Sequence, residues 1–212
     1  MHPQPPRRTF HAYGTPINRL VYDRWGRCGR PVVLLHGLGY DRTMWWPVAA
    51  ELGDSCAAVA VDLPGHGESA PRDDYAVDRL AHDLAMLVSR LELHRAPVLV
   101  AHAEAALLAD TFAQRYATQA VISVDVAPGG GEEPDLSGVP PLYRQFAVRR
   151  VDRQLLRAYR SWHQQPTTDL SAMAVSPARV RVGAAPEAHL GSGSFPHLRD
   201  PAGFAALLRT LR

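Results

Sequence analysis

Short apolar runs alternate with segments of helical periodicity along the first 125 residues of the chain. Four of the runs have the length and the flanking turns of strands that are buried on both faces: 31–35, 57–61, 96–100 and 120–124. Three segments between them space apolar residues three or four apart, as amphipathic helices do: 43–52, 77–91 and 104–116. Alternation this regular predicts an α/β fold with a doubly wound, mostly parallel sheet.

The two ends of this pattern predict an opening hairpin and a closing helix. Residues 9–25 alternate apolar and polar side chains around a Gly-Thr-Pro turn, which indicates a pair of antiparallel strands. Residues 200–211 have helical spacing, with Asp200 at the N-cap and Pro201 at the first helical position, where these residue types are favoured. Because 212 residues fit around one core, we expect a single domain over residues 1–212.

The periodicity is lost after residue 128. A loop rich in glycine and proline is followed by two arginine-rich helical stretches, at 142–148 and 151–162. We interpret residues 129–176 as a reduced lid within the single domain. Five of its arginines are candidates to gather an acidic ligand, although a solvated charged helix face is the simpler explanation: Arg149, Arg150, Arg153, Arg157 and Arg160.

The composition is that of a soluble globular domain. Hydrophobic residues make up 46% and charged residues 21% of the chain, and no apolar run approaches the roughly 20 residues that span a membrane. The first residues are rich in proline and lack the apolar stretch of a signal peptide, so we expect a cytoplasmic location and no membrane partner. A formal net charge of +2 and scattered arginines argue against a nucleic-acid partner.

The chain contains no lysine, and this absence excludes some chemistry. Schiff-base catalysis and lysine-anchored pyridoxal phosphate both need a lysine amine, and we expect no cofactor. The two cysteines, Cys28 and Cys56, lack the spacing of metal ligands. We therefore expect two free thiols and no metal site.

Four motifs, in order along the chain, resemble those of the α/β-hydrolase family. Residues 36–39 read HGLG, like the family's oxyanion loop, and residues 62–69 read DLPGHGES, like its glycine-rich turn. Residues 98–106 match the strand, turn and helix that carry the nucleophile, and residues 193–201 match the C-terminal motif. The resemblance implies a doubly wound sheet with a binding site at the carboxyl ends of its strands.

The catalytic positions depart from the family pattern. The resemblance places Ala103 where the family has its serine, and a methyl group cannot attack a carbonyl. Ser194 stands at the position of the catalytic histidine, and His197 matches a second, non-catalytic histidine. Residues 178–187 contain no aspartate to act as the triad acid. We therefore predict that the chain is not a serine esterase, and that the strained turn at Ala103 is free to relax.

The resemblance still implies a pocket for a small-molecule ligand. We expect it to be lined by the oxyanion loop, two tryptophans, a strand end and the residue after the degenerate nucleophile: Gly37, Leu38, Gly39, Trp45, Trp46, Asp125 and Glu104. Glu104 is a candidate general base, although a carboxylate at a helix start is also favoured by the helix dipole alone. His36 and His102 are further acid–base candidates, for which a structural role is the simpler interpretation.

Three functions are compatible with this sequence. We favour a biosynthetic small-molecule enzyme that performs a cyclisation, elimination or rearrangement without a covalent serine intermediate. An inactive binding or scaffold protein, which contacts a ligand or a protein partner, is the first alternative. The second is a hydrolase with rewired residues, in which Glu104 or a histidine activates water.

Overall fold

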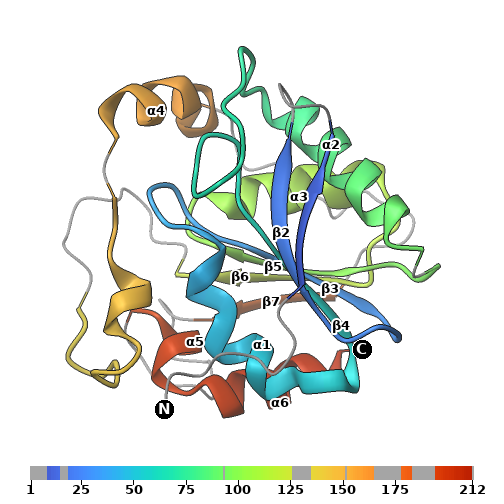
Figure 1. Ribbon diagram of the computed structural model, residues 1–212, viewed down its shortest axis with the longest axis vertical. Coiled ribbons are helices and arrows are strands. Elements are labelled where there is room, and N and C mark those ends of the chain that lie inside the picture. Colours follow the sequence, from blue (N-terminus) through green and yellow to red (C-terminus); the bar gives the residue numbers. More distant parts are fainter. Residues whose placement is uncertain are drawn as a thin grey trace.

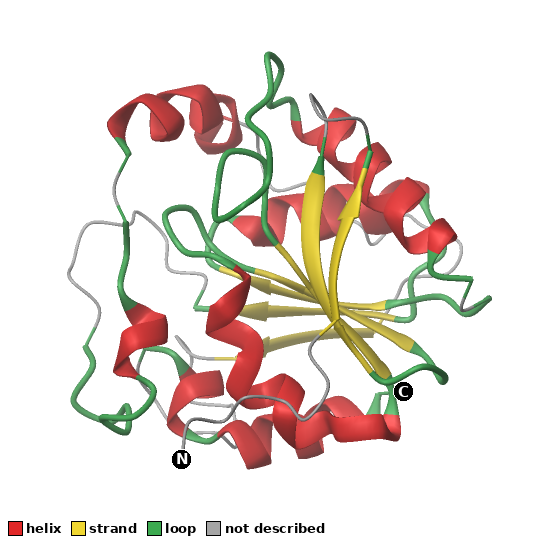
Figure 2. Cartoon of the chain, in the orientation of Figure 1, coloured by secondary structure: helices red, strands yellow, loops and turns green. Residues whose placement is uncertain are grey.

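The computed structural model describes residues 9–14, 19–92, 94–125, 135–150, 152–164, 178–182 and 194–211. The strands in these ranges are β1 (Thr9–Tyr13), β2 (Leu20–Trp25), β3 (Pro31–Leu35), β4 (Ala57–Val61), β5 (Val98–His102), β6 (Ala120–Val124) and β7 (Ala178–Val182). They form one sheet in the order β1-β2-β4-β3-β5-β6-β7 (Figures 1 and 2). β1 and β2 run antiparallel to their neighbours and the other five strands are parallel. The predicted hairpin and mostly parallel sheet are confirmed.

Helices cover both faces of the sheet. They are α1 (Trp46–Leu52), α2 (Val77–Arg90), α3 (Ala105–Arg115), α4 (Arg153–Ala158), α5 (Pro196–Arg199) and α6 (Pro201–Thr210), with 3-10 turns η1 (Arg42–Trp45), η2 (Gly53–Ser55), η3 (Arg144–Ala147) and η4 (Tyr159–Gln164). α2 and α3 pack together on one face, and α1, α5 and α6 pack on the other (Figure 1). As predicted, Asp200 caps α6 by accepting a hydrogen bond from the Gly203 N–H (2.9 Å).

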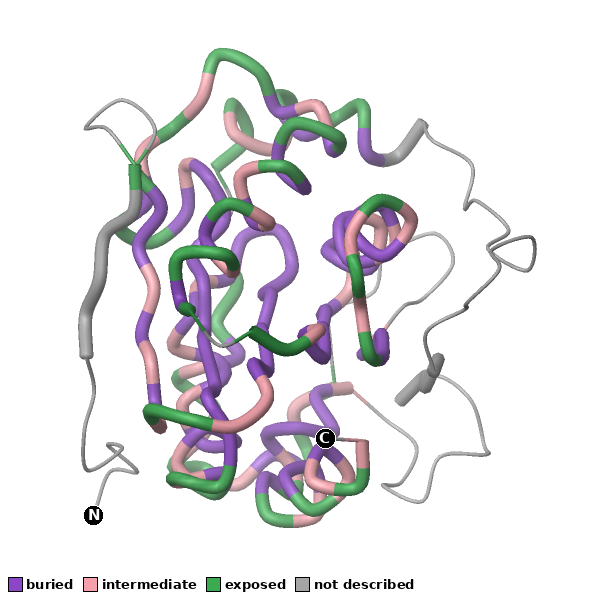
Figure 3. Tube along the Cα trace, turned by 90° about the vertical axis from the view of Figure 1, so that its right-hand side faces the viewer, coloured by how far each residue is buried: buried purple, intermediate pink, exposed green. Residues whose placement is uncertain are grey.

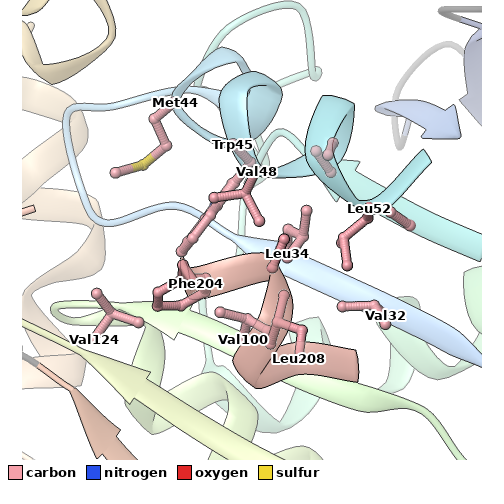
Figure 4. Close-up of a cluster of buried hydrophobic side chains, with 14 of the residues drawn as sticks. Val32, Leu34, Met44, Trp45, Val48, Leu52, Val100, Val124, Phe204 and Leu208 are labelled. Atoms are coloured by element: carbon pink, nitrogen blue, oxygen red, sulfur yellow. The ribbon is translucent and has the colours of Figure 1, made fainter. Parts of the chain in front are cut away.

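The core lies in two layers, one on each face of the sheet. Along β3, Val32 and Leu34 join the cluster under α1 and α6, which Figure 4 shows, whereas Val33 and Leu35 join the cluster under α2 and α3. Every residue of β3, β4 and β5 is buried, and Figure 3 shows the buried segments in purple inside the molecule. Because both faces are covered, these strands read as continuous apolar runs instead of alternating ones.

Three predicted elements differ from the structure. β5 begins at Val98 and not at residue 96, because Pro97 has no N–H to donate to a neighbouring strand. The helix expected over 142–148 is only the 3-10 turn η3, since the chain becomes extended at Val148 (ψ 111°). The stretch 151–162 holds the short helix α4 and then η4, and residue 151 lies outside the described residues. The lid boundaries, 129–176, stay a prediction, because much of that range is outside the described residues.

A buried arginine joins three segments beside the carboxyl ends of β3 and β4. The Arg42 guanidinium contacts the carboxylates of Asp62 (2.5 Å), Glu68 (2.8 Å) and Asp23 (3.1 Å). Asp62 also accepts hydrogen bonds from the backbone N–H groups of Arg42 (2.8 Å) and Glu68 (2.9 Å). Burial opposes the charge, but attraction to the three carboxylates leaves the pKa of Arg42 above its usual value. One cation thus fixes β2, η1 and the 62–69 turn relative to one another.

Replacing Arg42 by methionine is expected to lower the free energy of unfolding by about 3–5 kcal/mol, because the buried carboxylates of Asp23 and Asp62 lose their counter-ion. Arg79→Met is the matched control, since it removes only the exposed pair with Asp74 and should cost less than about 1 kcal/mol. Urea unfolding of both variants at neutral pH measures the difference. Equal losses in the two variants would contradict the structural role of Arg42.

Candidate functional site

The turn between β5 and α3 keeps a strained conformation. Ala103, at its tip, has a left-handed backbone (φ 50°), and its N–H donates to the Val124 carbonyl (2.7 Å). This conformation costs an L-residue roughly 1–2 kcal/mol. A Cβ at Gly37 would lie 2.7 Å from the His102 ring and 3.2 Å from the Ala103 methyl, so only glycine fits against the turn. The expectation that this turn relaxes is therefore wrong.

Glu104 directs its carboxylate to the oxyanion loop. It is the N-cap residue of α3, and its Oε2 accepts a hydrogen bond from the Leu38 N–H (3.2 Å). Its Oε1 lies 3.4 Å from a terminal nitrogen of Arg149. The Arg149 Nε also donates to the Leu38 carbonyl (3.0 Å). The Glu104 carboxylate therefore contacts both the Leu38 N–H of the loop and the Arg149 guanidinium of the lid, close to the tip of the turn.

The segment that carries Arg149 is tied to the same loop. The Arg150 N–H donates to the Gly39 carbonyl (2.7 Å), and a Cβ at Gly39 would lie 2.9 Å from the Arg149 side chain. Further along, the Tyr159 hydroxyl donates to the Pro64 carbonyl (2.8 Å). Figure 1 shows α4, which follows this segment, beyond the carboxyl ends of the strands. The described part of the lid is thus fixed above both glycine-rich loops.

Two histidines hold those loops together in a reciprocal way. The His36 Nε2, in the first loop, accepts a hydrogen bond from the Leu63 N–H (2.9 Å). The His66 Nε2, in the second loop, accepts one from the Gly39 N–H (3.0 Å). Burial lowers the pKa of each ring to about 4, so both are neutral and able to accept. With its other nitrogen beside the Gly37 carbonyl (2.8 Å), His36 has a structural position.

His102 and Asp125 connect the turn to the C-terminal segment. The His102 Nε2 lies 3.3 Å from the Asp125 carboxylate, which accepts a hydrogen bond from the Phe195 N–H (2.6 Å). The Phe195 ring stacks on the His102 ring, with centroids 5.3 Å apart. Ser194, next to Phe195, is half-buried, and no hydrogen bond in the described residues joins it to a histidine. His102 and Asp125 therefore act in the structure as a pair that fixes the chain after β7.

The two tryptophans lie in different surroundings. Trp45 is fully buried, 4.4 Å from the His197 ring and packed near Phe204, so it belongs to the core under α1 and α6 (Figure 4). Trp46 donates from its indole N–H to Asp23 (2.8 Å) and packs near Phe146 of η3. Of the two, only Trp46 faces the lid.

Sequence reasoning missed two participants. The sequence marks Arg149 only as one of five lid arginines. The structure shows that it contacts Glu104, which lies 45 residues away along the chain. Sequence reasoning did not single out His66, although a histidine within each of two glycine-rich motifs was a signal for a connection between them. The candidate site therefore consists of Ala103, Glu104, the Leu38 amide and Arg149.

Other features of the described residues lie apart from this group. They include no group of three or more potential metal-ligating side chains. None of the helices described is both long enough and apolar enough to cross a bilayer. A small pocket between the sheet and α2 is lined mainly by leucines, including Leu35, Leu84 and Leu108, and contains none of the site residues.

Comparison with known proteins agrees with this fold. The sequence model described as "Alpha/beta hydrolase family" matches residues 32–208. A protein of unknown function from Mycobacterium tuberculosis is 32% identical over 131 residues, which are 61% of this chain and 36% of the relative. A Mycobacterium tuberculosis esterase is 49% identical over 51 residues, 24% of this chain and 16% of that protein.

Among solved structures, the epoxide hydrolase CorEH is similar, with 27% identity and a TM-score of 0.53. The match covers 60% of this chain and 47% of that structure. The chain belongs to the alpha/beta hydrolase family. It spans about a third of the length of the first curated relatives that it matches, at 36%.

The histidine pair gives the protein a pH-dependent stability. Both rings have a pKa of about 4 in the folded chain against 6.5 when unperturbed, so the unfolded chain binds more protons between these values. The contribution of the two neutral rings to the free energy of unfolding is complete above pH 6.5 and is lost as the pH falls towards 4. His66→Gln keeps an acceptor for the Gly39 N–H but cannot titrate, so its stability should fall less over this range than that of the wild type.

Urea midpoints at several pH values between 7 and 4 measure this effect. His82→Gln, on the exposed face of α2, is the control and should follow the wild type. A His66→Gln variant with the full wild-type pH dependence would show that this ring does not hold the loops as a neutral acceptor.

Proposed function

We propose that this chain is a small-molecule enzyme that transfers protons without a covalent serine intermediate, with Glu104 as the base. The observation that carries the proposal is the hydrogen bond from the Leu38 N–H to the Glu104 carboxylate (3.2 Å). In hydrolases of this fold, an N–H of the corresponding loop stabilises the oxyanion of acyl transfer. A carboxylate at that donor opposes oxyanion formation but places a potential base beside the reacting position.

Substrate binding would free the base. The carbonyl oxygen of a bound substrate takes the Leu38 N–H in place of Glu104, and the carboxylate is released from that donor and from Arg149. It then accepts a proton from the carbon next to the carbonyl. The electron pair of the broken C–H bond forms a C=C bond, and the carbonyl oxygen becomes an enolate oxygen held by the Leu38 N–H. Return of the proton to another atom completes a rearrangement, and loss of a leaving group completes an elimination.

The conformation of the turn supports this proposal. Ala103 offers no hydroxyl, yet its backbone retains the left-handed conformation (φ 50°) and its contact with Gly37. Strain of this kind persists where the surrounding structure maintains it, and it gathers at functional sites. Here the turn sets the direction of the next residue, Glu104, so its geometry remains useful without a nucleophile.

Binding without turnover is the second candidate, and one observation favours it. Both oxygens of the Glu104 carboxylate already contact a donor, so the site is satisfied without a ligand. In that role, the pocket or the lid contacts a ligand or a protein partner. The esterase and epoxide hydrolase relatives raise hydrolysis as a third candidate, with water activated by Glu104.

A fluorophosphonate probe is expected not to label the wild-type protein, because the turn at Ala103 carries no serine. Ala103→Ser should be labelled weakly at most and show only trace esterase activity, since a serine without a base stays protonated. Mass spectrometry and a panel of activated esters measure the two properties. Robust ester turnover by Ala103→Ser would reveal a functional histidine, and wild-type labelling at Ser194 would favour the hydrolase.

Glu104→Gln keeps the shape of the side chain and removes its basicity. The rate of hydrogen–deuterium exchange next to the carbonyl, measured by NMR in D₂O over a panel of ketones and oxo acids, should fall roughly 10²–10⁴-fold. Glu51→Gln, at an exposed position of α1, is the matched control and should exchange like the wild type. Unchanged exchange in Glu104→Gln would rule out the base. Ligand binding without any wild-type exchange would favour the second candidate.

A further inference from the structure

The two donors that hold Glu104 are spaced for a pair of neighbouring oxygens. The Leu38 N–H and the Arg149 guanidinium bind the two oxygens of one carboxylate, at 3.2 Å and 3.4 Å. A ligand that replaces Glu104 at both donors must therefore present two oxygens about as close together as those of a carboxylate. A carbonyl and a carboxylate on adjacent or next-adjacent carbons meet this requirement.

Glu104 itself is held loosely. Charge-assisted N–H···O bonds are usually about 2.7–2.9 Å long, and both contacts of this carboxylate are longer. The Glu104 and Arg149 side chains are 26% and 42% exposed, so water competes for both groups. A ligand with a better fit can displace the carboxylate without breaking a buried ion pair.

Arg149, in contrast, is positioned in advance. Its Nε donates to the Leu38 carbonyl (3.0 Å), and the following residue, Arg150, is tied to Gly39 through its backbone (2.7 Å). A guanidinium has five N–H donors, so the group that contacts Glu104 remains able to bind an incoming anion. The guanidinium supplies the positive charge and the loop amide supplies the neutral donor.

The described part of the lid that follows Arg149 carries further positive charge. Three exposed arginines follow along α4 and η4, and none of them has an acidic partner within the described residues: Arg153, Arg157 and Arg160. Asp152 is used as the N-cap of α4, where it accepts from the Gln154 N–H (2.8 Å). A cluster of one sign raises the local concentration of ligands of the opposite sign. The excess of positive charge on this part of the lid thus favours the approach of an anion.

We propose that the substrate is a small oxo acid, with a carbonyl oxygen that takes the Leu38 N–H and a carboxylate, one or two carbons away, that pairs with Arg149. This assignment rests on the proposed function, because it names the substrate class of the same site. The Glu104 carboxylate competes with the substrate for both donors when the site is empty. Displacement by the oxo acid leaves that carboxylate next to the carbon that loses its proton.

Binding of 2-oxobutanoate and of its methyl ester, measured by calorimetry and by the NMR shift of the Leu38 amide, tests the proposal. The ester keeps the carbonyl and loses the charge, so it should bind roughly tenfold more weakly or worse. Arg149→Gln should weaken binding of the acid by a similar factor and leave the ester unaffected. Arg90→Gln, at the exposed end of α2, is the control and should change the affinity less than about twofold.

Glu104→Gln gives the sharpest test, since it has opposite expected effects on binding and on exchange. Loss of the competing charge should tighten the binding of 2-oxobutanoate roughly tenfold, with thermal unfolding used to show that the variant is folded. Equal affinities for acid and ester, or weaker binding of the acid to Glu104→Gln, would overturn the substrate assignment. Tight binding of the acid without proton exchange would overturn the proposed function and leave the oxo-acid assignment standing. Exchange of neutral ketones at the rate found for oxo acids would overturn the oxo-acid assignment and leave the proposed function standing.

Discussion

The buried contact between Arg42 and Asp62 is the constraint on which the site depends. Asp62 follows β4 directly, and Arg42 lies in η1, beyond the loop that follows β3, so their pairing fixes two loops that the sheet alone leaves free. A buried ion pair adds little net stability, because desolvation offsets most of the attraction, but an unpaired partner is costly. The main effect of the Arg42–Asp62 pair is therefore to fix the positions of these two loops. The reciprocal bonds of His36 and His66 work on the same loops and set their separation.

Once these loops are fixed, the turn at Ala103 has little freedom. Gly37 lies against it on one side, and the Val124 carbonyl binds its N–H on the other. The left-handed backbone is thus imposed by packing and does not need a serine to persist. The direction of residue 104 is therefore set by the backbone and by Gly37, and it does not depend on the side chain at position 103.

The sequence predicted the parts of this structure that carry a local signal. β3, β4 and β6 were located to the residue, because strands covered on both faces are unbroken apolar runs between turns. The helix expected over 142–148 was wrong, since the local sequence does not distinguish the 3-10 turn η3 from a helix. Glu104 was identified as a candidate from its unusual place beside the turn. Its contact with Arg149 had no such signal, because it depends on the path of the chain across 45 residues.

The contact between Glu104 and its two donors relates binding to reactivity. In the empty site both oxygens of the Glu104 carboxylate contact a donor, so neither is available to another partner until those contacts are exchanged. In the proposed enzyme, a ligand that takes over both donors loses some affinity to this competition, but it releases the carboxylate. A ligand that takes neither donor leaves Glu104 where it is. In the proposed enzyme, the same carboxylate thus disfavours ligands that lack the two neighbouring oxygens and acts on those that have them.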